Sequence, residues 1–390
     1  MTQTVDFAPY PFESGLDGGT LRDFFVWCAR QSVSDIHIQG GNHLVVGHNG
    51  RLRKASNFVL PDDKLSKLLD EVFNPEIRAT VRGGRPVDRA LQLDGDVNER
   101  FGLVRGERLR FRCNFVQATA GRLDTTIALT MRIIPSEIPP LRNLELEEDL
   151  FEALLPASGL GLIGGITGSG KSTLAASIYR FCLDNDADRK ITTTEDPIEF
   201  ILGRVGDVLA PTQLQIGRDV PTYAEGIRAH LRRAPSIIGV GEMRDFETFQ
   251  AGVLAGQLGH FNLSTLHIHS PGEAIPRCLT MVPAEMREAT ARDLLGVLQY
   301  IVVQKLLRTT DGKRQAVREY ILFDDPLRTK LSDMPYTQWG QHIDGIIRAE
   351  NRRFADHAWT LYQNDRIDRH ELAVAMTAFQ LRELEQRERL

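Results

Sequence analysis

The architecture of this chain follows from one motif, Gly165-Ile166-Thr167-Gly168-Ser169-Gly170-Lys171-Ser172-Thr173. The motif matches G-x-x-x-x-G-K-[ST], the phosphate-binding loop of nucleoside triphosphatases. The apolar stretch 160–164 predicts a buried strand before it, and the apolar periodicity of residues 173–183 predicts a helix after it. Glycines between a strand and a helix let backbone N–H groups curl around phosphates. The sequence therefore predicts an α/β nucleotide-binding fold.

The side chains of this loop have separate expected roles toward a nucleoside triphosphate. Lys171 is expected to reach the β- and γ-phosphates, and the Ser172 hydroxyl is expected to bind Mg²⁺. The amino end of the following helix adds partial positive charge. ATP and Mg²⁺ are thus the expected cofactors, and the other expected nucleotide-binding residues of the loop are Gly165, Thr167, Gly168, Ser169, Gly170 and Thr173.

Length and composition are typical of a soluble globular protein with two or three domains. The 390 residues are 42% hydrophobic and 25% charged. A net charge of −5 and the lack of a basic–aromatic stripe argue against direct nucleic-acid binding. No apolar run is long enough for a transmembrane helix, and the polar, acidic residues 1–10 do not resemble a signal peptide. Buried thiols rather than a zinc site are expected for Cys28, Cys113, Cys182 and Cys278.

The first third of the chain predicts an α+β domain, residues 20–134, after a loose arm at residues 1–19. Amphipathic helices are expected at 20–31 and 62–73. Asn49-Gly50 stands between alternating stretches and predicts a β-hairpin. Because the other alternating stretches also read as strands, we expect a mostly antiparallel sheet that includes residues 34–38, 87–93, 108–117 and 125–134.

One of these strands carries basic residues on one face. Arg108, Arg110 and Arg112 alternate with apolar residues that run from Leu109 to Phe115. Two interpretations are open: the arginines are solvated, or they meet an anion or an acidic partner surface.

The second part of the chain predicts a parallel sheet. The proline-rich stretch within residues 135–144 is the expected linker, residues 145–326 alternate between strands and helices, and residues 327–390 read as a helical C-terminal region. Alternation of this kind implies a parallel sheet with helices on both faces. The phosphate-binding loop then lies at the carboxyl edge of that sheet, which further includes the expected strands 190–194, 236–240 and 261–268. Residues 319–323 read as a late strand.

Carboxylates follow two of these strands. Glu242 ends an apolar strand, as in a Walker B element, with Gly241 where many such enzymes have aspartate. We expect Glu242 to contact Mg²⁺ through water. Three more carboxylates, Glu195, Asp196 and Glu199, follow the strand at 190–194. One of the three is expected to activate the attacking water, and spacing alone does not select it.

Histidines and arginines complete the candidate site. His260 and His267 flank the strand at 261–268, and no nearby cysteine or acid completes a zinc site with them. Arg228 and Arg232 share one helix face, which is either solvated or supplies arginine fingers to a phosphate site.

These motifs, in this order, resemble the PilT-like secretion ATPase family, the ring motors of type IV pili and of type II and type IV secretion. The resemblance runs from about Ser34 to about Phe323. It implies a RecA-like ATPase domain after a PAS-like N-terminal domain. The quoted signatures are the loop 167–173, an acidic box at 195–200, an atypical Walker B element at 240–245, a histidine box from 259 to 267, and the N-terminal stretches 34–38 and 110–114.

The resemblance also implies roles for individual residues. It makes Glu199 the catalytic glutamate, and it places His260 and His267 among the catalytic residues. Arg228 and Arg232 stand where the family has arginines that reach a neighbour's nucleotide. The sheet face that carries Arg110 and Arg112 is likewise expected to reach the nucleotide of a neighbouring subunit. A homohexamer with ATP between its subunits follows from this reading.

Two features of the sequence bear on which kind of motor within the family this chain resembles. The pilus-retraction signature A-I-R is missing, and residues 324–328 stand near its place. Residues 311–314 and 318–320 look more like the DotB/TraJ branch of type IVB secretion and conjugative transfer. The expectation is a cytoplasmic ATPase that reaches the inner membrane only through proteins of a secretion or transfer apparatus. The alternatives are a pilus-retraction ATPase, a nucleic-acid translocase, and an adaptor that binds ATP with negligible turnover.

Overall fold

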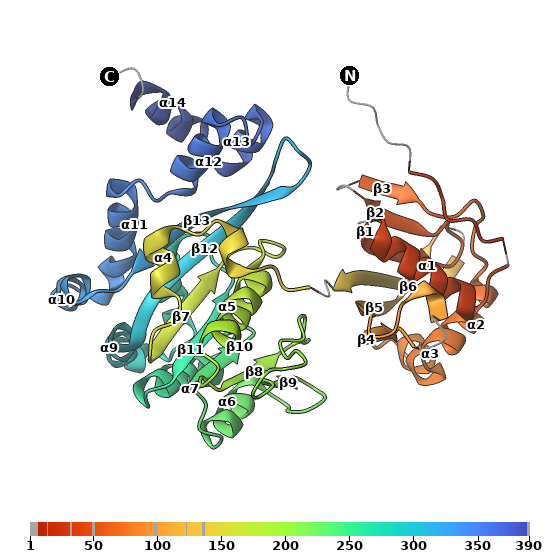
Figure 1. Cartoon of the computed structure of the whole chain (residues 1–390), viewed down its shortest axis with the longest axis horizontal. Helices are drawn as coiled ribbons and strands as arrows, with labels where there is room; N and C mark the ends of the chain where they lie inside the picture. The colour runs from red at the N-terminus through yellow and green to blue at the C-terminus, as the bar shows by residue number, and fades with distance from the viewer. Residues whose placement is uncertain are drawn as a thin grey trace. The chain divides into compact units, whose positions relative to one another are not determined.

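The computed structural model describes residues 7–13, 15–31, 33–48, 51–96, 100–121, 123–134 and 137–387. The chain forms two compact units, Met1–Glu137 and Ile138–Leu390. Each unit has one central sheet and its own hydrophobic core (Figure 1).

The first unit is built on a six-stranded antiparallel sheet, which confirms the predicted α+β class. The strand order is β3-β2-β1-β6-β5-β4. Three helices pack their apolar side chains into the core of this unit: α1 (Gly18–Arg30), α2 (Asp62–Val72) and α3 (Pro75–Arg82). The strands are β1 (Val33–Gln39), β2 (Val45–His48), β3 (Arg51–Lys54), β4 (Val87–Asp94), β5 (Arg108–Ala120) and β6 (Leu123–Ile134).

Side-chain caps explain where the first helices begin. The Asp17 carboxylate accepts the backbone N–H of Thr20 at 2.8 Å, so a free donor of the first turn of α1 is satisfied. Asn74 caps α3 in the same way, and Pro75 follows at the first helical position, where its missing N–H costs nothing.

Two expectations for the first unit need comment. The described part of the expected loose arm is packed rather than loose, because Phe7, Tyr10 and Phe12 lie against the core. The backbone N–H of Tyr10 also donates to the Ala55 carbonyl at 3.0 Å. The predicted turn at residues 49–50 lies outside the described residues, although β2 and β3 pair in antiparallel register up to His48 and Arg51.

Strand β5 has the two faces that its alternation predicts. Phe111 and Phe115 are fully buried, whereas Arg108 and Arg112 are exposed. Arg108 pairs with Asp94 of the neighbouring strand at 2.7 Å. Arg112 lies opposite Arg132 of β6. Arg132 in turn pairs with Asp35 of β1 at 2.8 Å, so carboxylates already match two of the guanidinium groups on this face.

The second unit contains a seven-stranded sheet in the order β13-β12-β7-β11-β10-β8-β9. All neighbouring strands are parallel except β12 and β13. The predicted parallel sheet is therefore confirmed. Its strands are β7 (Gly159–Gly164), β8 (Ile191–Glu195), β9 (Thr212–Gln215), β10 (Ile237–Val240), β11 (Phe261–Leu266), β12 (Leu298–Arg308) and β13 (Arg314–Leu322).

Helices cover both faces of this sheet (Figure 1). On one face, α4 (Glu148–Ala153) and α5 (Lys171–Asn185) bury apolar side chains against the strands. On the other face lie α6 (Tyr223–Leu231), α7 (Phe246–Gln257), α8 (Ala274–Thr280) and α9 (Arg287–Val297). The later helices extend this second layer: α10 (Asp325–Ser332), α11 (Trp339–Ala349), α12 (Phe354–Gln363), α13 (Arg369–Ala375) and α14 (Ala378–Arg387).

The boundaries of the second unit differ from the expected ones. Ile138 and Leu141, from the expected linker, are buried in its core. Leu331, Ile343 and Leu372, from the expected C-terminal region, belong to the same apolar cluster as Leu298 of β12. The helical C-terminal region is therefore packed into the second unit. Among the helices of the described residues, none has the length and hydropathy that a bilayer crossing requires.

A buried histidine makes the stability of the second unit depend on pH. His230 of α6 is fully buried, with Nε2 2.9 Å from the Thr194 hydroxyl, and burial lowers its pKa to about 4. The unfolded chain takes up this proton near pH 6.5, so the stabilisation is present above that pH and is lost as the pH falls toward 4. We expect unfolding at pH 5 to cost about 2 kcal/mol less than at pH 7 on account of His230.

Denaturant unfolding at the two pH values measures this loss. The His230→Gln variant, which keeps a hydrogen-bonding amide near Thr194, is expected to remove most of the difference. An equal loss of stability in the variant and the wild type would assign the pH dependence to other groups.

Candidate nucleotide site

The loop between β7 and α5 has a backbone conformation that requires glycine. Gly165, Gly168 and Gly170 have φ values of 143°, 79° and 86°, in the region that side chains rarely adopt. A Cβ atom on Gly165 would stand 2.3 Å from the Ser169 hydroxyl oxygen. Because β7 is paired with β12 on one side and β11 on the other, the loop sits at the carboxyl edge of the sheet.

Lys171 is the first residue of α5 and folds back over the loop. Its ammonium donates to the carbonyls of Gly165 at 2.7 Å and Ile166 at 3.0 Å. Burial lowers the pKa of Lys171, and the nearby carboxylates of Glu242 and Glu199 offset part of this effect. The structure therefore brings both predicted acids into the electrostatic neighbourhood of this lysine.

Glu242 follows β10, and three nearby side chains contact its carboxylate or the backbone just before it. One carboxylate oxygen accepts Arg244 Nε at 2.7 Å, and the other lies 3.4 Å from His267 Nε2. The Thr265 hydroxyl at the end of β11 donates to the Gly241 carbonyl at 2.5 Å, which fixes the backbone just before Glu242. Burial and the charge of Lys171 lower the pKa of His267. The imidazole is thus favoured in its neutral form beside Glu242.

The three carboxylates after β8 have different surroundings. Glu195 accepts from the Thr193 hydroxyl at 2.6 Å and from Gln213 Nε2 at 3.0 Å, and burial raises its pKa. Asp196 lies 3.9 Å from Arg244 and is partly exposed. Glu199 is the member of this group whose charge raises the pKa of Lys171. Of these three carboxylates, Glu199 is therefore the one whose charge acts on the lysine of the loop, whereas Glu195 is held by Thr193 and Gln213.

His260 is not brought to this site within the subunit. It directly precedes β11, whose first residue, Phe261, pairs with Gly159 at the start of β7. The six residues of β11 span about 20 Å at roughly 3.3 Å per residue, so His260 lies at the opposite edge of the sheet. Its Nδ1 lies 2.7 Å from the Pro235 carbonyl. The two histidines of the predicted box therefore have different surroundings, and only His267 stands beside Glu242.

The structure records no contact between Lys171 and the predicted arginines among the described residues. Arg228 lies on α6 and Arg232 just after it; both are exposed, and neither side chain makes a hydrogen bond or an ion pair with the residues that the structure describes. Arg110 and Arg112 belong to β5 of the first unit. A role for these four side chains toward nucleotide remains a prediction.

The loop and its surroundings fit a triphosphate with a divalent cation. Glycines with positive φ leave the backbone open to close approach, the amino end of α5 is adjacent, and Lys171 supplies a cation. The Ser172 hydroxyl and the Glu242 carboxylate are the oxygen groups that suit Mg²⁺.

Sequence reasoning missed two residues of this neighbourhood. Gln304 of β12 donates from Nε2 to the Ser169 carbonyl at 2.6 Å, and Arg244 pairs with Glu242. The available signal for Gln304 was that it and Lys305 interrupt the apolar residues of β12, and this strand was itself not predicted.

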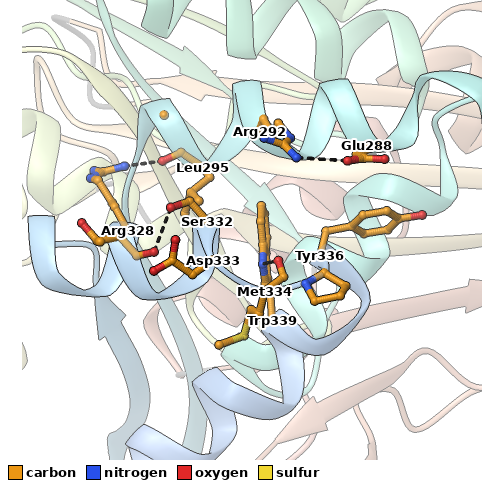
Figure 2. A pocket seen from close by; sticks show the side chains of 12 residues that line it. Glu288, Arg292, Leu295, Arg328, Ser332, Asp333, Met334, Tyr336 and Trp339 are labelled. Atoms are coloured by element: carbon orange, nitrogen blue, oxygen red, sulfur yellow. Dashed lines mark hydrogen bonds and ion pairs between the residues drawn. The ribbon is translucent and has the colours of Figure 1, made fainter.

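A separate pocket of about 800 Å³ lies between α9, α10 and the start of α11 (Figure 2). Arg292 pairs with Glu288 at 3.1 Å, and the Arg328 guanidinium donates to the carbonyls of Leu295 and Leu298. Because these cationic groups are already paired and the lining shares no residue with the loop, we assign no role to this pocket.

Comparison with known proteins agrees with this geometry. The sequence profile of the family described as type II/IV secretion system protein matches residues 31–367. The type IV pilus ATPase PilU of Pseudomonas aeruginosa is 35% identical over 299 residues, which are 76% of this chain and 73% of PilU.

Two solved structures are similar to the whole chain. The X-ray structure of the Legionella pneumophila ATPase DotB superposes with a TM-score of 0.82 at 30% identity, over 92% of this chain and 95% of DotB. The crystal structure of the pilus retraction motor PilT with bound ADP superposes with a TM-score of 0.77 at 27% identity, over 95% of this chain and 99% of PilT.

Proposed function

Because this chain belongs to the type II/IV secretion system protein family and is an ATPase, we propose that it is the hexameric motor of a type IVB-like secretion or conjugative transfer apparatus. The observation that carries the proposal is the arrangement of Lys171, Glu199 and Glu242 at the carboxyl edge of the sheet. A lysine held by a glycine loop and faced by two carboxylates suits phosphoryl transfer to water.

Each residue of the site has one part in hydrolysis. The loop N–H groups and Lys171 bind the β- and γ-phosphates of ATP, so the lysine exchanges its two carbonyl partners for phosphate oxygens. Glu199 orients the attacking water and accepts its proton. Glu242 is kept in place by Arg244 and Thr265 and acts near the cation. Mg²⁺, when bound, neutralises part of the charge that develops on the phosphates.

The exposed arginines support assembly into a ring. Arg228 and Arg232 extend from α6 without partners among the described residues, so both guanidinium groups are available to another subunit. We propose that they act on the γ-phosphate of a neighbour and that Arg110 and Arg112 supply further cationic contacts. Repeated head-to-tail contact of this kind closes into a cyclic oligomer.

The expected partners are membrane proteins of the apparatus. We propose a cytoplasmic location with attachment to the inner membrane through these proteins. The DotB/TraJ-like stretches at 311–314 and 318–320 favour a secretion or transfer motor, while the PilU and PilT relatives keep pilus retraction as the second candidate.

Mass and turnover measured on the same samples test the ring. Six chains of 43.8 kDa give an expected mass of about 263 kDa. If ATP is held between subunits, only assembled rings hydrolyse it. When a dilute sample is concentrated and rings form, the ATPase rate is therefore expected to rise faster than linearly with protein concentration. A monomer with full, concentration-independent turnover would contradict the proposal, and strong stimulation by single-stranded DNA would favour a nucleic-acid translocase instead.

A further inference from the structure

The phosphate-binding loop packs against the buried amide side chain of Gln304. Gln304 is 3% exposed on β12, and its Nε2 donates to the Ser169 carbonyl at 2.6 Å. A Cβ atom on Gly170 would stand 2.7 Å from Gln304 Nε2, and one on Gly165 would stand 2.6 Å from the Gln304 carbonyl oxygen. Both ends of the glycine loop therefore pack against Gln304.

Arg318 sets the orientation of this amide. Gln304 and Arg318 are directly opposite in the β12–β13 pair, and Arg318 Nε donates to Gln304 Oε1 at 3.1 Å. A guanidinium group has donors and no acceptor, so the amide oxygen must face Arg318 and the NH₂ group must face the loop. Arg318 is 1% exposed, which leaves it little freedom to turn away.

The remaining donors of Arg318 reach the start of the second unit. Its two terminal nitrogens donate to the carbonyls of Glu145 at 3.0 Å and Leu144 at 2.8 Å. These residues follow the boundary between the two units, at Glu137 and Ile138, by only a few positions. One continuous set of hydrogen bonds thus runs from the Ser169 carbonyl to residues 144–145.

We propose that Gln304 is a positioning residue for the phosphate loop, that Arg318 orients it, and that this pair couples nucleotide binding to residues 144–145. The inference rests on the proposed nucleotide site. Loss of the Gln304 donor frees the Ser169 carbonyl and lets the loop leave the conformation that binds phosphate. A buried hydrogen bond of this kind corresponds to about tenfold in affinity.

The test measures ADP binding to the full-length chain by calorimetry. Gln304→Glu keeps the shape and the Arg318 contact but places an acceptor against the Ser169 carbonyl, so we expect about tenfold weaker ADP binding. Gln304→Asn adds no charge and falls short of the loop by one methylene group, and the same loss is expected. Gln299→Glu, at the other end of β12, is the matched control and is expected to bind ADP as the wild type does.

Hydrogen exchange of residues 141–147 tests the coupling. In the wild type, ADP is expected to slow the backbone hydrogen exchange of residues 141–147. In Gln304→Glu, saturating ADP is expected to leave the exchange rates of these residues unchanged. The same pattern is expected for Arg318→Lys, whose single ammonium cannot reach Gln304 and both carbonyls.

The outcomes separate this inference from the function on which it rests. A wild type that does not bind ADP overturns the nucleotide site. A wild type that binds ADP, with both Gln304 variants binding within twofold of it, overturns the positioning role alone. Equal protection of residues 141–147 in the wild type and in Gln304→Glu overturns the coupling.

Discussion

The Lys171→Ala variant is expected to lose nucleotide binding by at least about 100-fold and to show no turnover above background. In the structure, the ammonium of Lys171 bridges the carbonyls of Gly165 and Ile166 inside the loop. Alanine removes both the cation that pairs with the phosphates and the contacts that hold the empty loop together. The charges of Glu242 and Glu199 then remain close to the phosphates without a compensating cation, and this repulsion weakens binding further.

Fluorescent nucleotide titration and phosphate release measure this prediction. Lys313→Ala is the matched control, because its side chain is 81% exposed in the β12–β13 turn, and it is expected to bind and turn over ATP normally. Unchanged affinity in Lys171→Ala would show that the loop is not the phosphate site.

The Glu199→Gln and Glu242→Gln variants are expected to bind ATP within a few fold of wild type but to turn it over at least about 100 times more slowly. Glutamine keeps the size of each side chain and removes its negative charge. In Glu199→Gln the attacking water loses its proton acceptor. In Glu242→Gln the carboxylate that pairs with Arg244 and His267 is lost, so the group proposed to act near the cation no longer carries charge.

Single-turnover kinetics separate chemistry from binding for both variants. Glu247→Gln, an exposed position on α7, serves as the control with expected wild-type turnover. A near wild-type rate in either test variant would remove that glutamate from the mechanism.

Local patterns were sufficient to predict the core of the fold. The loop 165–173, the strand before it and the helix after it are adjacent in the chain, so their order alone gives the phosphate site. Strand β12 was missed because a short apolar run does not distinguish a buried strand from a buried helix.

The parts of the site that the sequence could not predict depend on contacts between distant residues. Gln304 reaches Ser169 across 135 positions, and no local motif marks such a pair. His260 and His267 are close in sequence, but a strand stands between them, so residues at its two ends face opposite edges of the sheet. Residue spacing alone did not select among Glu195, Asp196 and Glu199; the family resemblance selected Glu199, and the fold adds that Thr193 and Gln213 hold Glu195.

The ring with shared sites is the central claim, and mixing two inactive variants tests it most directly. Glu199→Gln and Arg228→Ala are each expected to be inactive as pure rings. In rings formed from equal amounts of both, about a quarter of the interfaces combine an intact Glu199 with an intact Arg228 from the neighbour, so ATPase activity is expected to return in part. No recovery, in rings shown to exchange subunits, would contradict the claim that Arg228 completes the site of a neighbouring subunit.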